Sequence, residues 1–500
     1  MKLKPIQANQ PSAPSEHLSA GHIDLNTMNL NKLAGFALGP VGSAALGVIS
    51  LPLLSWYFAA EDLGRISLLQ TVGSLVLIAL GLGLDQAYIR EYHAEENKAA
   101  LLKTVLAVPL ALLAAAALAA LPLLPQISAH IFDLPSFRLG LLTVVFCAAL
   151  LLTRYLSIVL RMQERAWAFS FSQLIPKVLV LLLTAFYVFT YSRNHTLNLA
   201  TAYTTAQVLT VIILVWQTRS ALQTAFTAPA DRTLRRRCLH YGTPLALGGL
   251  AYWGLVSADR FLLKHYAGFA ELGVYALAAS FGAAALIVQS IFSTIWSPTL
   301  FRWVQHNENL HRVGRIFRLL AAVVLAVWCA AGLLSPLLAW LLPPKYSDVQ
   351  FIVPAFMLYP LLYTLTEVGG IGINVRRKTH LAALVSLAAL SANLALGSLL
   401  IPHFGARGAA ASTAAAFWLF FFLKTEISVR LWQPLPRAGL YAATLGALAV
   451  STAYALYGHT GQRLPFTLFW LVGLLLLLWL HRNDMAALKH WLKGRLNIPS

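Results

Sequence analysis

Charged side chains are scarce in this sequence. Only 11% of its 500 residues are Asp, Glu, Lys or Arg, whereas 58% are hydrophobic, and a typical soluble protein has about 25% charged residues. So few charges cannot cover the surfaces of the roughly two to four soluble domains that a chain of this length would form. The composition therefore excludes a soluble globular protein and predicts that most of the surface faces lipid.

Cysteine is also rare, and enzyme motifs are missing. Cys147, Cys238 and Cys329 are far apart in the sequence, which excludes a disulfide framework and a Cys-based metal site. The chain has no phosphate-binding loop of the Walker type, no H-E-x-x-H and no G-x-S-x-G. We therefore expect neither a metal site nor a cofactor, and we expect the protein not to be an enzyme.

The hydrophobic residues are grouped in runs of about 20, the length with which a helix crosses a bilayer. Fourteen runs predict fourteen membrane-spanning helices, and the loops between them are too short to form a separate domain. Residues 1–33 lack the apolar core of a cleavable signal peptide and are expected to form a tail. The predicted spans are 34–56, 66–84, 101–124, 139–160, 171–191, 197–217, 241–263, 274–297, 316–342, 350–373, 380–401, 407–423, 438–457 and 464–481.

The basic residues test this arrangement, because short cytoplasmic loops are enriched in Lys and Arg. If tail 1–33 is cytoplasmic and a basic residue in the first or last three positions of a span is counted with the adjoining loop, the inner segments hold 27 of the 37 basic residues and each of the seven outer loops holds one. The alternation predicts that both tails, 1–33 and 482–500, are cytoplasmic. The net charge of +19 then reflects membrane topology, so a nucleic-acid partner is not needed to explain it.

The chain contains an internal repeat. An offset of 209 residues aligns positions 37–78 with 246–287 and gives thirteen identities, against roughly four expected by chance. Biased composition is the alternative explanation. Because span 1 matches span 7, the two halves are parallel, and a cavity is expected between them. We predict an all-α polytopic fold with two six-helix bundles (34–217 and 241–423), a basic cytoplasmic linker (218–240) and two further helices (424–481).

The first span carries a stripe of small residues. Gly35, Gly39, Ser43 and Gly47 recur every four positions and therefore lie on one face of the helix. Such a face lets another helix approach closely. Bending for gating and static close packing are both compatible with this pattern.

Two basic residues lie inside the predicted spans of the first half. Arg154 and Lys177 are each six residues from the cytoplasmic end of their span, hence about 9 Å deep at 1.5 Å per residue. At one depth on consecutive antiparallel helices, they could bind a phosphate between them. The alternative is that both extend to the cytoplasmic headgroups.

Three charged residues lie inside the spans of the second half. Asp259 and Arg260 are adjacent, so their side chains leave the helix about 100° apart and no direct pair is expected. Arg260 could contact an anion near the outer side, or anchor there. Glu367 lies in a Gly-rich stretch that could be unwound, so Glu367 and Asp259 are candidates for a coupling cation or proton; a hydrogen-bonded carboxyl group is the alternative.

Six segments point to a known family. They are LPLL at 51–54, EDLGRIS at 61–67, LGLGLD at 80–85, IREY at 89–92, DRFL at 259–262 and AELGVY at 270–275. These segments resemble the polysaccharide repeat-unit flippases of the Wzx type, within the multidrug/oligosaccharidyl-lipid/polysaccharide (MOP) exporter superfamily. The resemblance implies a bacterial inner-membrane protein with a cationic central cavity that moves polyprenyl-diphosphate-linked oligosaccharide outward. Its partners would be membrane lipids and possible polysaccharide polymerase machinery. Arg90 lies in one of these segments and joins the substrate-binding candidates Arg154, Lys177 and Arg260.

Three functions follow from these patterns. The first is a flippase that works by alternating access, driven by the membrane potential, a proton or Na⁺. The second is a cation-coupled multidrug exporter of the same superfamily, which would have an acidic, aromatic cavity. The third is a membrane-embedded glycan polymerase or acyltransferase, which the short outer loops disfavour.

Overall fold

The computed structural model describes residues 30–190, 195–306, 310–376, 378–461 and 463–480. These residues form helices and contain no β-strand. The first half of the chain contains α1 (Leu30–Tyr57), α2 (Ala60–Gly81), α3 (Leu84–Glu91), α4 (Lys98–Ala120), α5 (Leu124–Phe132), α6 (Phe137–Met162), α7 (Ala166–Thr190) and α8 (His195–Thr227). The second half contains α9 (Arg232–Tyr266), α10 (Gly268–His306), α11 (Val313–Leu334), α12 (Leu338–Leu341), α13 (Val349–Gly369), α14 (Ile371–Val375), α15 (Thr379–Leu431), α16 (Ala438–Tyr457) and α17 (Arg463–Leu480).

The helices agree with the predicted spans. Eleven helices of the described chain are long and apolar enough to cross a membrane, and α17 is a shorter apolar helix. The 53-residue helix α15 is broken at Gly405, whose φ of 53° and ψ of −131° are not helical, so it supplies two spans. A side chain at Gly405 would meet the Glu271 carboxylate, which accepts a hydrogen bond from Ala406 N at 2.8 Å. With the charged helix α9, the total is approximately the fourteen expected.

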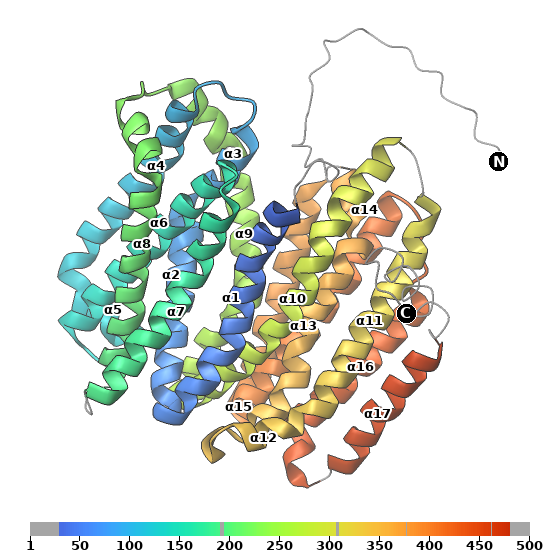
Figure 1. The fold of residues 1–500 in the computed structure, drawn as a ribbon. Coiled ribbons are helices and arrows are strands. Elements are labelled where there is room, and N and C mark those ends of the chain that lie inside the picture. Colours follow the sequence, from blue (N-terminus) through green and yellow to red (C-terminus); the bar gives the residue numbers. More distant parts are fainter. Residues whose placement is uncertain (1–29, 191–194, 307–309, 377, 462, 481–500) are drawn as a thin grey trace.

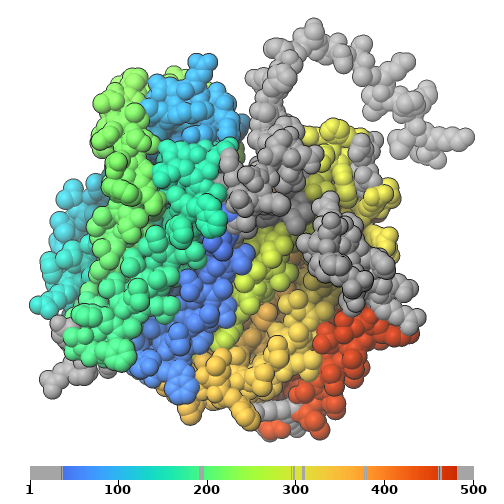
Figure 2. Space-filling model, viewed as in Figure 1, coloured from blue at the N-terminus to red at the C-terminus, as the bar shows by residue number. Residues whose placement is uncertain are grey.

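The helices form two lobes, which Figure 1 shows side by side. The first lobe is built on the pairs α1–α7, α6–α8 and α7–α8, and the second on α9–α15, α10–α13 and α13–α15. Helices α16 and α17 pack on the outside of the second lobe, against α11, α13 and α15. The lobes meet mainly along α2 and α10, and α1 lies between α7 and α10 (Figure 2).

The two ends of the bundle differ. Helices α3 and α14 lie at one end, and α5 and α12 at the other (Figure 1). The charge alternation predicts that the α3/α14 end is cytoplasmic. The expected linker 218–240 is mostly helical, because α8 runs to Thr227 and α9 begins at Arg232. Tail 482–500 and nearly all of tail 1–33 are outside the described residues.

Helix α7 packs on the small-residue stripe of α1. A Cβ atom on Gly39 would be 2.8 Å from the Cα of Ser170. The Gly39 N–H donates a hydrogen bond of 2.9 Å to Ser170 Oγ, and this hydroxyl donates to the Gly35 carbonyl. The stripe is therefore a close-packing surface between α1 and α7.

This contact predicts different effects for two glycines that the repeat makes equivalent. Gly39→Ala is expected to destabilise the protein by about 1–3 kcal/mol, because the new methyl group has no space. Gly248→Ala should be neutral or slightly stabilising, because its methyl group would meet only Ala383 Cβ, at 4.0 Å. Thermal unfolding of both purified variants in detergent tests the difference. Equal effects at the two positions would contradict the assigned packing.

The internal repeat is visible as a reciprocal contact between the lobes. A Cβ atom on Gly64 of α2 would be 2.1 Å from the carbonyl oxygen of Phe269, and one on Gly273 of α10 would be 1.9 Å from that of Ala60. Phe269 and Gly273 follow Ala60 and Gly64 by the same 209 positions. Such reciprocity is the property of a two-fold axis, which here relates two halves of one chain. The predicted internal repeat is confirmed.

A second contact joins the lobes at the α3/α14 end. Gly83 has a φ of +66°, and a Cβ atom there would be 2.3 Å from the carbonyl oxygen of Gly242 in α9. These two glycines are not equivalent under the repeat. The lobes thus touch near both ends, and the space that they enclose lies between these contacts.

Candidate substrate site between the lobes

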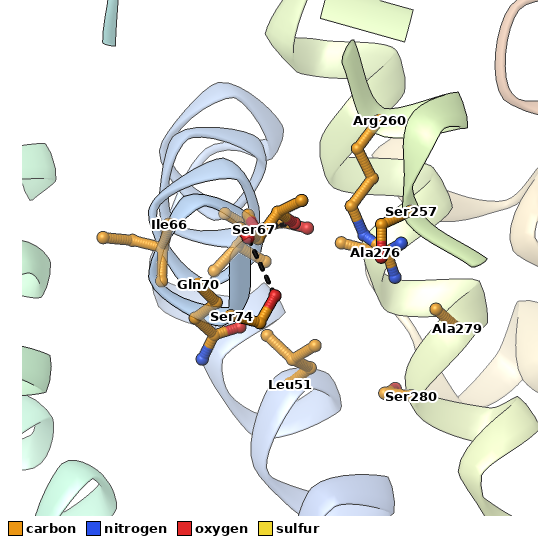
Figure 3. Close-up of a pocket in the computed structure, with 12 residues that line it drawn as sticks. Leu51, Ile66, Ser67, Gln70, Ser74, Ser257, Arg260, Ala276, Ala279 and Ser280 are labelled. Carbon is orange, nitrogen blue, oxygen red and sulfur yellow. Dashed lines mark hydrogen bonds between the residues drawn. The ribbon is translucent and has the colours of Figure 1, made fainter. Parts of the chain in front are cut away.

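A cavity of about 280 Å³ lies between α1, α2, α9 and α10 (Figure 3). Seven of its twelve lining residues have polar or charged side chains. Hydroxyl and amide groups come from one face of α2, since Ser67, Gln70, Thr71 and Ser74 follow helical spacing. The remaining lining residues are Leu51, Leu63, Ile66, Ser257, Arg260, Ala276, Ala279 and Ser280.

The cavity lies on the pseudo-two-fold axis. Eight of its lining residues form four pairs separated by 209 positions, namely 51 and 260, 67 and 276, 70 and 279, and 71 and 280. The chemistry of the pairs is nevertheless unequal. Helix α2 supplies hydrogen-bonding groups where α10 supplies Ala276 and Ala279, and Arg260 stands where the first half has Leu51. The site therefore has one polar wall and one cation.

Arg260 reaches from α9 into the space between the lobes, with Ser67 and Ser74 on the facing helix (Figure 3). Its side chain is 17% exposed. One Nη donates a hydrogen bond of 3.0 Å to the Val256 carbonyl. A guanidinium group has five N–H donors, so donors remain for a ligand anion.

Asp259 lies in the interior of the second lobe and does not line the cavity. Its carboxylate accepts hydrogen bonds from Tyr275 of α10 and, at 3.1 Å, from Thr413 of α15. Its Oδ1 makes no hydrogen bond and lies 3.6 Å from the guanidinium group of Arg260. The expectation that these neighbours do not pair was wrong, because the long Arg260 side chain folds back across the 100° between them.

Arg154 and Lys177 have separate partners. Arg154, 43% exposed, forms an ion pair of 2.8 Å with Asp85 of α3. Lys177 donates a hydrogen bond to the Ser43 carbonyl of α1. The structure does not bring the two cations together as expected, because residue count does not fix the direction of each side chain. Their positions along the helices also differ, since Arg154 is eight residues from the end of α6 and Lys177 is eleven residues from the start of α7. Neither residue lines the cavity, and a role in substrate binding stays a prediction for both.

Arg90 lies where α3 of the first lobe meets α9 of the second. Its guanidinium group is 4.3 Å from the ring centre of Tyr241. Beside it, Arg237 forms ion pairs of 3.0 Å with Glu91 and 2.7 Å with Glu95. These contacts hold the lobes together at the α3/α14 end. Arg90 is therefore placed at the predicted cytoplasmic entrance and not in the cavity.

Glu367 lies near a break between helices, as expected. Helix α13 ends at Gly369 and α14 begins at Ile371. Lys424 of α15 lies beside this segment and donates a hydrogen bond of 3.3 Å to Oγ1 of Thr366. The sequence analysis missed Lys424 because the apolar run of the twelfth span stops at residue 423, whereas the helix continues to Leu431. A helical pattern that continues beyond residue 423 was the signal that could have placed Lys424 inside the helix.

Two pseudosymmetric lobes of membrane-spanning helices, with a polar cavity on the axis between them, define a multi-pass membrane protein of the transporter class. The sequence pattern of the family described as "polysaccharide biosynthesis protein" matches residues 32–304. The chain belongs to this family. No curated protein matches the sequence.

Solved structures show the same fold. The lipid II flippase MurJ in an inward closed conformation superposes with a TM-score of 0.67 at 14% identity, covering 90% of this chain and 99% of that chain. An inward-facing multidrug resistance MATE family transporter of the MOP superfamily gives 0.58 at 13% identity, covering 80% and 96%. An outward-facing one gives 0.53 at 15% identity, covering 83% and 96%. Family and fold together support a transporter or flippase of the MOP type.

Proposed function

We propose that this protein is a flippase that moves a polyprenyl-diphosphate-linked oligosaccharide from the cytoplasmic to the periplasmic leaflet of the bacterial inner membrane. The observation that carries the proposal is the polar cavity on the axis between the lobes, with Arg260 as its one cation. The family description, polysaccharide biosynthesis, fits this substrate. We propose that both termini are cytoplasmic, as the basic residues predict.

The chemistry of the cavity suits such a headgroup. A polyprenyl tail is stable in lipid, so only the sugars and the diphosphate need a polar path. Hydroxyl and amide groups on α2 can exchange hydrogen bonds with sugar hydroxyls, and a guanidinium group binds phosphate with two parallel hydrogen bonds. A cavity of about 280 Å³ is at the lower limit of known ligand pockets. We propose that it grows as the lobes move.

We propose that the other basic candidates act along the path to the cavity. Arg90 and Arg154 are paired with groups near the α3/α14 end, where a diphosphate would enter. A diphosphate is a stronger partner for a guanidinium group than a single carboxylate. Moving about two negative charges outward across 100 mV is favourable by about 4–5 kcal/mol, so the membrane potential could supply the direction.

Reconstitution tests the proposal. Purified protein in vesicles is given a fluorescent polyprenyl-diphosphate oligosaccharide in one leaflet, and exposure of the sugar on the other side is measured with a lectin. We expect transfer much faster than in protein-free vesicles. Transfer no faster than in empty vesicles, together with efflux of organic cations, would favour the multidrug exporter, although the cationic cavity argues against it. Formation of new glycosidic or acyl bonds would favour the membrane-embedded enzyme.

A further inference from the structure

A groove lined by basic residues lies at the α3/α14 end of α9. Its volume is about 710 Å³, against about 280 Å³ for the cavity between the lobes. Its described lining residues all belong to the first half of α9. They are Arg232, Arg235, Arg236, Leu239, His240, Thr243, Pro244 and Leu247.

Three guanidinium groups gather at the start of this groove without a counter-charge. Arg232 precedes Arg235 by three residues and Arg236 by four, so the arginines are neighbours on the helix surface. All three are exposed, and among the described residues no carboxylate lines the groove or pairs with them. Arg237, which does not line the groove, is instead paired with two glutamates of the first lobe. The like charges in the groove repel one another, and an anion bound between them would relieve this repulsion.

The groove becomes apolar with distance from its arginines. Leu239, Pro244 and Leu247 line its deeper part. Leu247 is eleven residues beyond Arg236, hence about 16 Å deeper at 1.5 Å per residue. Cations at the predicted membrane surface, followed by apolar side chains within the membrane, match the order of the headgroup and chain of an anionic lipid. The groove therefore suits an amphiphile with a phosphate headgroup.

The groove lies on the side of α9 that also lines the cavity. Thr243 of the groove and Ser257 of the cavity are fourteen residues apart, which is about four turns, so they project from nearly the same side of the helix. Their separation along the axis is about 21 Å. A ligand in the groove would therefore lie at the predicted cytoplasmic end of a path to the cavity.

The number and spacing of the cations favour a diphosphate over a phospholipid. A phosphate group binds a guanidinium group with two parallel hydrogen bonds. A phospholipid with one phosphate would leave the other adjacent arginines uncompensated, whereas two linked phosphates can bind two neighbouring arginines at once.

We propose that this groove is a loading site for a prenyl diphosphate. The diphosphate binds Arg232, Arg235 and Arg236, and the first isoprene units lie on Leu239 and Leu247, before the headgroup enters the cavity. The inference rests on the proposed function, since it takes the lipid of that substrate as its ligand, and it adds a binding site ahead of the cavity.

Protection of a thiol in the groove tests the proposal. Thr243→Cys is introduced into the full-length protein whose three buried cysteines are replaced by Ala, and its reaction with a maleimide is followed in detergent. Saturating farnesyl diphosphate is expected to slow the reaction about tenfold or more. Farnesyl monophosphate should require about tenfold higher concentrations for half protection, and phosphatidylglycerol should not protect.

A second substitution assigns this protection to the arginines. Arg236→Met should raise the half-protecting concentration of farnesyl diphosphate about tenfold or more, because one hydrogen-bonded charge pair is lost. Arg219→Met, at an exposed arginine of α8 outside the groove, is the matched control and should leave that concentration unchanged. Both arginines are exposed, so neither substitution removes a buried contact.

Three results would overturn the proposal. They are no protection by farnesyl diphosphate, equal protection by phosphatidylglycerol, and protection that Arg236→Met does not weaken. Flipping in vesicles without protection of the thiol would remove the loading site and leave the proposed function intact. Protection without flipping would support the site and count against the flippase alone.

Discussion

Arg260→Met is expected to slow flipping of the lipid-linked oligosaccharide in vesicles by about tenfold to a hundredfold. Arg260 is the one cation among the residues that line the cavity, and a hydrogen-bonded charge pair with phosphate contributes about 1.5–3 kcal/mol. Arg260→Lys should keep part of the activity, because an ammonium group retains the charge and loses the two parallel hydrogen bonds. Initial rates at several substrate concentrations measure both effects.

The same substitution also leaves Asp259 without its neighbouring cation, so stability must be separated from binding. Asp259 is buried and lies 3.6 Å from the guanidinium group. Arg260→Met combined with Asp259→Asn removes both charges and should recover thermal stability without recovering flipping. Arg138→Met, at an exposed arginine near the α5/α12 end, is the control for loss of a positive charge. Normal flipping by a folded Arg260→Met protein would remove Arg260 from the site.

Much of the fold could be predicted from the sequence because lipid imposes a strong pattern. Each span needs about 20 apolar residues, and the basic residues alternate between the two sides. The repeat was visible because identities such as Leu63-Gly64 and Leu272-Gly273 preserve a backbone contact that tolerates no side chain. Sequence alone did not reveal that these two glycines face each other.

The partners of the intramembrane charges could not be predicted. Depth along a helix follows from residue count, but the direction of a side chain depends on how the helix is rotated against its neighbours. Arg154 turns to Asp85 of α3 and Lys177 turns to the Ser43 carbonyl, although the predicted spans gave both the same depth. Lys424 was missed for a related reason, since its ammonium group donates to Thr366 inside the lobe and does not mark the end of the helix.

Gly64→Ala and Gly273→Ala are each expected to open the cavity at the α5/α12 end. Each new methyl group would lie about 2 Å from a backbone carbonyl of the other lobe, so α2 and α10 have to separate. Overpacking of this kind costs about 1–3 kcal/mol, enough to reduce the population of the closed state by roughly tenfold to a hundredfold. Flipping should fall in both variants, because a lobe contact that cannot close interrupts alternating access.

A cysteine introduced at Ser67, which lines the cavity, reports the opening in a protein whose three buried cysteines are replaced by Ala. Its reaction with a membrane-impermeant maleimide added to whole cells should accelerate about tenfold or more in either glycine variant. Because the two contacts are reciprocal, the two variants should show the same acceleration. Gly446→Ala, where a Cβ atom would meet nothing within 4 Å, should leave the rate unchanged. Acceleration in one variant and not the other would contradict a two-fold axis through this contact, because the repeat makes the two methyl groups equivalent.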